Sequence, residues 1–366
     1  MSDIYYVQPI ARRLLLSMHK KNCNLPVHPR YLKTLDEQQF WHAYGELRDI
    51  FEDFYRRAVE YPESTSLPLY RLDEHDFKTK EAKAGRVSLL NLSVVLLAIS
   101  LASVWENNAL VVSHACFKAA IKSLKGAQTT EQIQRFCDNG FVFSNWNGKK
   151  FLPCDTFKLD YPDNPNILAV IAAIGDKFDQ YRQAQEKILG LEYMEQFIQF
   201  DPRIFADDSG TLPPKTFIHM IDTFTESNRQ LYYAIVDKFK ERELELKLNA
   251  YFGAFYNSKG KDTLNNISFG HYSVGIRENE PLTLRLKLIR ISQYINKIET
   301  LPSHLRVSFE NVKCFNCSEK CTRKVRYSLG GKSKIACACD TFVFRDYAIS
   351  DLDTLMALFD AEEHCK

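Results

Sequence analysis

Apolar residues recur at helical spacing through the first part of the chain. One short amphipathic helix is predicted by the series Val7, Ile10, Leu14 and Met18. A longer helix is predicted where the step alternates between four and three residues, at Phe40, Tyr44, Leu47, Phe51, Phe54 and Ala58. Thr34-Leu-Asp-Glu37 has the form of a capping box for it. We therefore expect a helical N-terminal region, residues 1–80, with the longer helix packed along a partner helix.

The stretch from Val87 to Trp105 carries no charge and is almost long enough to cross a membrane. It contains several serines, and it lacks aromatic belts and a flanking block of Lys or Arg. A helix buried on all sides explains this composition better than a membrane span. We expect no membrane partner.

The next elements occur in a recognisable order. The pattern predicts a helix at 87–105, a short strand at 110–112, helices at 113–124 and 130–139, and a hairpin of strands 141–143 and 150–152. Asn147-Gly148 supplies the hairpin turn. From Ala82 to Tyr161 this order resembles a winged helix, which implies a winged-helix-like segment at residues 81–165.

Many winged helices place their third helix in the major groove of DNA. Here that helix carries Glu131, Arg135 and Asp138, a net charge of −1, which opposes phosphate contact. Cations lie beside it instead, on the preceding helix and in the hairpin: Lys118, Lys122, Lys125, Lys149 and Lys150. DNA contact through these lysines stays open, and a protein contact or a purely structural role is favoured over it.

A connector and a second domain follow. Asn164 and Pro165 fit the start of a helix, so residues 166–212 are expected to form a helical connector. Helical spacing from Phe217 to Phe239, and alternation from Leu282 to Leu288, predict an α+β domain at 213–310. We expect one face of its sheet to be exposed, with these residues on it: His271, Tyr272, Arg285 and Lys287.

Cysteines cluster near the end of the chain. Five of the ten occur in two groups, Cys314, Cys317 and Cys321, then Cys337 and Cys339. A strand, a Gly330-Gly331 turn and a returning strand separate the groups and would bring them side by side. Four thiolates in two groups favour structural Zn²⁺, bound by four of the five. Residues 311–366 thus read as a zinc-ribbon-like end with a terminal helix.

Two alternatives to zinc stay open for these cysteines. An iron–sulfur cluster is disfavoured because the spacing departs from that of ferredoxins. Reduced or disulfide-paired cysteines without metal are the other alternative.

The Cys-rich end is also the most basic part of the chain. Between 313 and 334, seven Lys and Arg residues stand against the single carboxylate of Glu319. Such a field attracts polyanions, so we predict nucleic-acid contact by Arg323, Lys324, Arg326, Lys332 and Lys334. The alternative is that these cations only keep a small two-stranded unit soluble.

Three local features together resemble an uncharacterised family of bacterial cytoplasmic proteins. They are Tyr161-Pro-Asp-Asn-Pro165, Gly140-Phe-Val-Phe143 and the terminal Cys groups. The resemblance implies no activity.

Composition narrows the function little. The chain has 366 residues and a net charge of +2, so two or more domains are expected and no class of partner is demanded. The first residues do not read as an export signal, and ten cysteines then favour the reducing cytoplasm. Phosphate-loop, dinucleotide-binding, His-Glu-x-x-His and nucleophile-elbow motifs are missing.

We therefore expect a multidomain α+β protein that binds nucleic acid or a protein partner in a regulatory or scaffolding role. The alternative is an enzyme with its site between the α+β domain and the Cys-rich end. The oligomeric state stays open.

Overall fold

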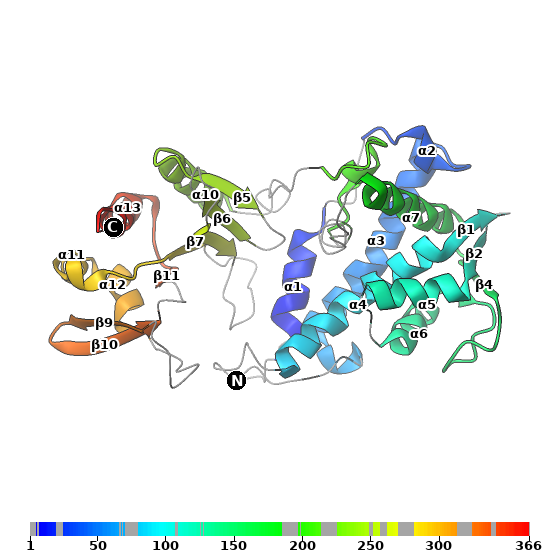
Figure 1. Cartoon of the computed structure of the whole chain (residues 1–366), viewed down its shortest axis with the longest axis horizontal. Coiled ribbons are helices and arrows are strands. Elements are labelled where there is room, and N and C mark those ends of the chain that lie inside the picture. Colours follow the sequence, from blue (N-terminus) through cyan, green and yellow to red (C-terminus); the bar gives the residue numbers. More distant parts are fainter. Residues whose placement is uncertain are drawn as a thin grey trace. The chain divides into compact units, whose positions relative to one another are not determined.

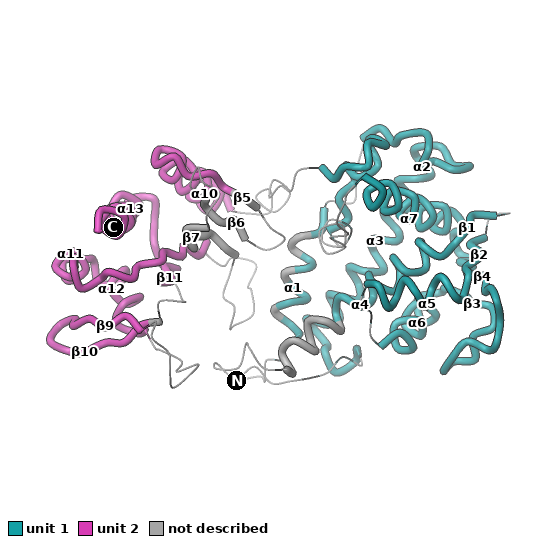
Figure 2. The backbone as a smooth tube through the Cα atoms, in the orientation of Figure 1, with its two compact units in different colours: residues 1–215 teal, residues 216–366 magenta. Residues whose placement is uncertain are grey.

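The computed structural model describes residues 5, 7–19, 25–65, 67, 69, 80–106, 109–124, 126, 128–184, 197, 199–213, 225–248, 252–256, 262–269, 282–312, 324–337 and 342–365. The described residues form a mixture of helices and β-sheets, as the predicted α+β class requires (Figure 1). Contacts divide the chain into unit 1, residues 1–215, and unit 2, residues 216–366 (Figure 2). The finer division into five parts stays a prediction.

Unit 1 is mainly helical. The helices of its described residues are α1 Val7–Ser17, α2 Pro29–Leu32, α3 Glu37–Glu60, α4 Lys80–Ala102, α5 His114–Ser123, α6 Thr129–Asp138 and α7 Asn166–Ala184, with short 3-10 turns η1 Pro62–Thr65 and η2 Pro202–Phe205. The predicted apolar seam of α3 is buried along its whole length. The capping box of α3 is formed by Asp36 and Gln39 rather than by Thr34 and Glu37. Asp caps a helix as well as Thr does, so the sequence was compatible with a helix start at either Thr34 or Asp36.

A four-stranded antiparallel sheet completes unit 1. Its strands are β1 Ser103–Glu106, β2 Ala109–Ser113, β3 Val142–Phe143 and β4 Thr156–Asp160, in the order β1-β2-β4-β3. Two predictions were wrong here. The helix predicted to reach Trp105 ends at Ala102, because Ser103–Glu106 pairs with β2. The strand returning from β3 is β4 rather than 150–152, which lies in the intervening loop with one isolated bridge between Trp146 and Phe151.

Helix α4 lies at the centre of unit 1 and contacts α1, α5, α6 and α7. From Val94 to Ser100 every residue is buried, which explains the uncharged stretch in the sequence. None of the helices formed by the described residues is long and apolar enough to cross a membrane. Helix α7 crosses α4 closely, because a Cβ on Gly175 would lie 2.4 Å from the carbonyl oxygen of Ser100.

A buried lysine fastens the end of unit 1. The Nζ atom of Lys177, in α7, donates to the backbone carbonyl of Asp207 at 2.9 Å and to its Oδ1 at 3.2 Å. Lys177 is 1% exposed, so this pairing compensates a cation removed from water. Hydrogen bonds from Ser209, followed by those from Lys177, hold the pKa of the Asp207 carboxyl below its usual value. The end of the predicted connector, at Asp207, is thereby bound to α7.

Unit 2 contains two sheets and four helices among its described residues. The helices are α10 Glu226–Lys240, α11 Ile295–Glu299, α12 Ser303–Glu310 and α13 Leu352–His364, with the 3-10 turns η3 Ile291–Gln293 and η4 Ile349–Asp351. A five-stranded antiparallel sheet has the order β11-β8-β7-β6-β5, from β5 Glu245–Leu248, β6 Phe252–Tyr256, β7 Asp262–Phe269, β8 Leu282–Leu286 and β11 Phe342–Phe344. A separate two-stranded sheet is formed by β9 Lys324–Leu329 and β10 Lys332–Cys337.

The exposed sheet face predicted for unit 2 was wrong at β8. This strand lies between β11 and β7, and Thr283 is only 2% exposed. Arg285 and Lys287 are half-buried rather than exposed. Both faces of β8 are therefore at least partly covered by other residues, and such cover cannot be inferred from alternation alone. His271 and Tyr272 lie outside the described residues.

Residues after the two-stranded sheet return to the core of unit 2. Strand β11 pairs with β8, and buried residues from Leu231 to Ala361 form one apolar cluster. In α13 the buried carboxylate of Glu362 accepts hydrogen bonds from the backbone N–H of Ile289 and Arg290 and from the Tyr294 hydroxyl. The C-terminal helix is therefore an integral part of unit 2.

We expect Gly175→Ala to lower the free energy of unfolding of unit 1 by about 1–3 kcal/mol. Alanine improves helix propensity by about 1 kcal/mol, but the added Cβ would collide with the backbone of α4. All three tryptophans, Trp41, Trp105 and Trp146, lie in unit 1, so urea unfolding followed by tryptophan fluorescence measures this unit. An unchanged or raised stability would contradict the close crossing.

Candidate nucleic-acid interface

The hairpin predicted about Gly330-Gly331 is confirmed as an antiparallel ribbon, with strands at Lys324–Leu329 and Lys332–Cys337. Six Cα pairs join β9 to β10, from Lys324–Cys337 at one end to Leu329–Lys332 at the turn. Gly330 and Gly331 form the turn with φ of +57° and +73°, a backbone conformation that glycine adopts without strain. We call strands β9 and β10 with this turn the ribbon.

The inner face of the ribbon is docked on the core of unit 2. Val325, Tyr327 and Leu329 alternate along β9 and are all buried. The hydroxyl of Tyr327 donates to the carbonyl oxygen of Phe309, at the end of α12, at 2.7 Å. Strand β9 also contacts η3 and α11. The ribbon is therefore held against unit 2 by packing and by a buried hydrogen bond.

The outer face of the ribbon carries two of the predicted cations. Lys324 is half-buried and Arg326 is exposed, in alternation with the inner-face residues. Ile335, the β-ladder partner of Arg326, is 39% exposed. Within the described part of the chain, neither side chain of Lys324 and Arg326 forms a hydrogen bond or an ion pair. Both cations are thus available to an external anion.

The other predicted cations of this region are placed differently. Lys332 and Lys334 pair with Leu329 and Tyr327, so they belong to the side of the ribbon that is docked. Lys334 Nζ donates to the carbonyl oxygen of Glu310 at 2.6 Å, whereas Lys332 is exposed beside the turn. Arg323 lies outside the described residues. Among the described cations, strand alternation therefore places Lys324 and Arg326 on one face of the ribbon and Lys332 and Lys334 on the other.

Most of the predicted metal ligands lie outside the described residues, namely Cys314, Cys317, Cys321 and Cys339. Cys337 ends β10, and its backbone pairs with Lys324 at the open end of the ribbon. The segments that carry the two Cys groups therefore leave the ribbon at the same end. Among the side chains that the structure describes, no group of three potential ligands comes together. Zinc binding stays a prediction.

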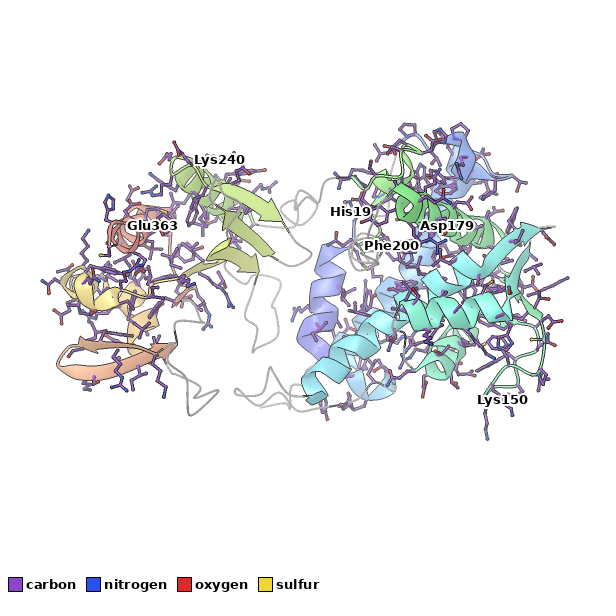
Figure 3. The ribbon with its side chains drawn as sticks, viewed as in Figure 1. His19, Lys150, Asp179, Phe200, Lys240 and Glu363 are labelled. Carbon is purple, nitrogen blue, oxygen red and sulfur yellow. The ribbon has the colours of Figure 1, made fainter. Side chains whose placement is uncertain are left out.

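In unit 1 the predicted cations lie on α5 and on the loop from Ser144 to Asp155, between β3 and β4. Lys118 and Lys122 are exposed one helical turn apart on α5, and Lys149 and Lys150 are exposed in the loop. Lys150 points away from the body of unit 1 (Figure 3). Lys125 lies outside the described residues.

Contacts at its base and tip hold this loop in place. The ring of Phe151 stacks on that of Phe157 with centroids 4.2 Å apart and also contacts His114 at the start of α5. At the tip, Thr130 Oγ1 in α6 donates to the carbonyl oxygen of Lys149 at 3.4 Å. The two loop lysines therefore lie beside the N-terminal end of α6.

The position of Arg135 limits what α6 contributes. Its guanidinium donates to the carbonyl oxygen of Thr65 at 2.5 Å and to Gln132 Oε1 at 2.9 Å. It also lies 4.9 Å from the centre of the Phe54 ring. Burial and then the nearby charge of Arg57 lower the pKa of Arg135 despite the opposing effect of Glu131 and Asp138. The only cation of α6 thus faces α3 and η1, and the exposed charges on α6 are Glu131 and Asp138.

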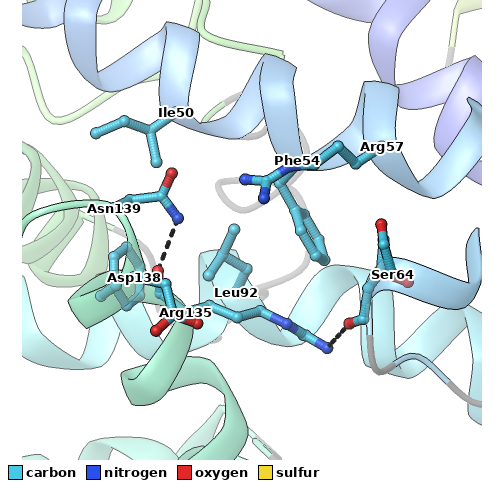
Figure 4. A pocket seen from close by; sticks show the side chains of 10 residues that line it. Ile50, Phe54, Arg57, Ser64, Leu92, Arg135, Asp138 and Asn139 are labelled. Atoms are coloured by element: carbon cyan, nitrogen blue, oxygen red, sulfur yellow. Dashed lines mark hydrogen bonds between the residues drawn. The ribbon is translucent and has the colours of Figure 1, made fainter. Parts of the chain in front are cut away.

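A small pocket lies where α6 meets α3, α4 and η1 (Figure 4). Its volume is about 80 Å³, and it is lined by Ile50, Phe54, Arg57, Ser64, Thr65, Leu92, Arg135, Phe136, Asp138 and Asn139. The amide of Asn139 donates to the Arg135 carbonyl, and Arg57 pairs with Asp53. Asn139 and Arg57 are therefore already paired. The pocket lies within the packing that holds α6 against α3, α4 and η1.

Comparison with known proteins adds no further constraint. No protein-family model, curated protein or solved structure matches the chain.

We expect Arg135→Met to destabilise unit 1 by about 1–3 kcal/mol, because it leaves the carbonyl of Thr65 and the amide of Gln132 without their donor. Arg56→Met is the matched control, since Arg56 is exposed in α3 and pairs only with Glu52 on the surface. Urea unfolding followed by tryptophan fluorescence compares the two. Equal losses would show that the joint at Arg135 contributes nothing beyond a surface pair.

Proposed function

We propose that this chain is a nucleic-acid-binding protein whose contact is the outer face of the ribbon, supported by a structural zinc site at the ribbon's open end. The observation that carries the proposal is the pair Lys324 and Arg326. Both lie on one face of a ribbon whose other face is docked, and both lack partners among the described side chains. Cations that have no partner among the described residues are suited to phosphate contact.

The distribution of charge supports this location. The whole chain has a net charge of +2, whereas residues 313–334 carry +6, so the remainder carries −4. A zinc ion with four thiolates lowers the local charge by 2, which leaves this region positive. A positive region on an otherwise acidic chain directs a polyanion to that region.

The register of the ribbon supports the zinc site. Tetrahedral Zn²⁺ takes its thiolates from two segments that lie close together. Two residues separate Cys321 from the start of β9, and one residue separates Cys339 from the end of β10. Because Lys324 pairs with Cys337, the chain enters and leaves the ribbon at the same end. Four of the five cysteines would then close the ribbon opposite its glycine turn.

The winged-helix hypothesis for unit 1 has separate support. Helices α4, α5 and α6 and strands β2, β3 and β4 follow one another in the expected order, with β4 between β2 and β3 in the sheet. Its third helix exposes two carboxylates, while Arg135 is bonded internally. We therefore propose that this segment contacts a protein or serves as structure, and that the nucleic-acid contact lies on the ribbon instead. For the enzyme alternative, we assign no catalytic residues among those that the structure describes.

The ribbon proposal predicts a loss of retention on heparin and on nucleic acid for the double variant Lys324→Glu, Arg326→Glu. Removing the cations of the contact, of which Lys324 is placed for phosphate, lowers the slope of log affinity against log salt by about 1 to 2. Point variants are required because β11 and α13 belong to the core of unit 2, so a truncation before the ribbon would unfold it.

The matched control is Lys118→Glu, Lys122→Glu, which reverses two exposed charges on α5 in unit 1. Unchanged retention of this control together with loss in the ribbon variant supports the proposal. The opposite pattern would move the contact to unit 1, and retention of neither protein nor variants would end the nucleic-acid hypothesis.

The zinc proposal predicts close to one zinc per chain in elemental analysis of protein purified without added metal, with no visible colour. Cys339→Ser should reduce the zinc content, because structural sites depend on their full ligand set, and binding is worth on the order of 10 kcal/mol. Cys116→Ser, at an exposed free cysteine of α5, is the control and should leave zinc unchanged. Stoichiometric iron with sulfide, or metal-free protein with a folded ribbon, would refute the assignment.

A further inference from the structure

We infer that the outer face of the ribbon lies in the major groove of B-form duplex DNA and contacts base edges there through Arg326 and Ile335. The inference rests on the proposed function and names the class of nucleic acid that this face fits.

The dimensions of the ribbon suit the major groove. Two paired strands lie about 4.8 Å apart, and a groove about 12 Å wide admits a two-stranded ribbon. Among the described residues the ribbon forms a sheet of its own, and its inner face is docked on the core through Val325, Tyr327 and Leu329. Unit 2 therefore supports the ribbon from behind and leaves the outer face for the groove.

The side chains of the outer face suit base edges. Arg326 and Ile335 are direct ladder partners, so their Cβ atoms are about 5 Å apart on one face. An arginine binds O6 and N7 of guanine with two parallel hydrogen bonds, and an aliphatic side chain contacts the methyl group of thymine. Ser328 and Ser333, exposed on this face, donate to or accept from either kind of base pair. Lys324, at the end of the ribbon, is suited to phosphate.

The same face lacks what single strands require. Proteins that bind unpaired strands stack the bases on aromatic side chains. Tyr327 is the only aromatic residue of the ribbon, and it is buried on the inner face with its hydroxyl bonded to Phe309. Duplex RNA is disfavoured as well, because its major groove is too deep and narrow for side chains to enter. B-form DNA is the remaining class.

Competition binding with the full-length, zinc-containing protein tests the inference. A duplex selected from a randomised DNA pool, its separate strands and an RNA duplex of the same sequence compete for the protein at one salt concentration. We expect the selected DNA duplex to bind at least about tenfold more tightly than either competitor. Tighter binding of the single strands or of duplex RNA would overturn the inference and leave the proposed function intact. Failure to bind any of the three would refute both.

Two substitutions test base contact separately from charge. Arg326→Lys keeps the charge but loses the paired hydrogen bonds, which contribute about 1–3 kcal/mol of discrimination. We expect the preference of this variant for the selected sequence over random duplex to fall by about tenfold, with the salt slope unchanged. Lys332→Gln, at the exposed cation beside the turn, is the control and should keep that preference. If Arg326→Lys keeps the full preference, or if the pool yields no preferred sequence, base readout by this face is refuted.

Discussion

The burial of α4 is the constraint on which unit 1 depends. A helix that is apolar on all sides must be covered on all sides, and here α1, α5, α6 and α7 contact it. Gly175 permits the closest approach, since any side chain there would displace the backbone at Ser100. Covering α4 also fixes α6, whose Ile133 and Phe136 are buried. The orientation that buries these two residues directs Arg135 toward Thr65 and away from solvent.

In unit 2 the alternation of side chains along one strand, β9, determines which residues are exposed. Along β9 the odd-numbered residues are buried in the core, and the even-numbered ones face away from it. The core thereby determines which cations are presented, since Lys324 and Arg326 follow from the positions of Val325 and Tyr327. The same hydrogen bond that holds Tyr327 to Phe309 removes its ring from the outer face. The alternation along β9 therefore determines both how the ribbon packs on the core and which side chains its outer face exposes.

Periodic patterns in the sequence predicted the elements that alternate or repeat strongly. The seam of α3, the strand at β8 and the hairpin about Gly330-Gly331 are all present. Features that depend on distant partners were not predictable. Strand β1 exists because β2 lies beside it, and Arg135 is bonded to a carbonyl 70 residues away. Strand β8 likewise pairs with β11, which follows it by more than fifty residues.

For the candidate interface, too, the sequence predicted local features but not those that depend on residues distant in the chain. Composition located the basic segment, but it could not separate Arg326 from Lys334, since that separation needs the register and the docking face. Register also relates the two proposed features to each other. Lys324 lies at the open end, where the Cys-bearing segments leave, whereas Arg326 is flanked by the buried Val325 and Tyr327. An isolated two-stranded hairpin is marginally stable, so a metal at that end would fix Lys324, while the core alone holds Arg326. Phosphate affinity would thus depend on metal more strongly than base contact does.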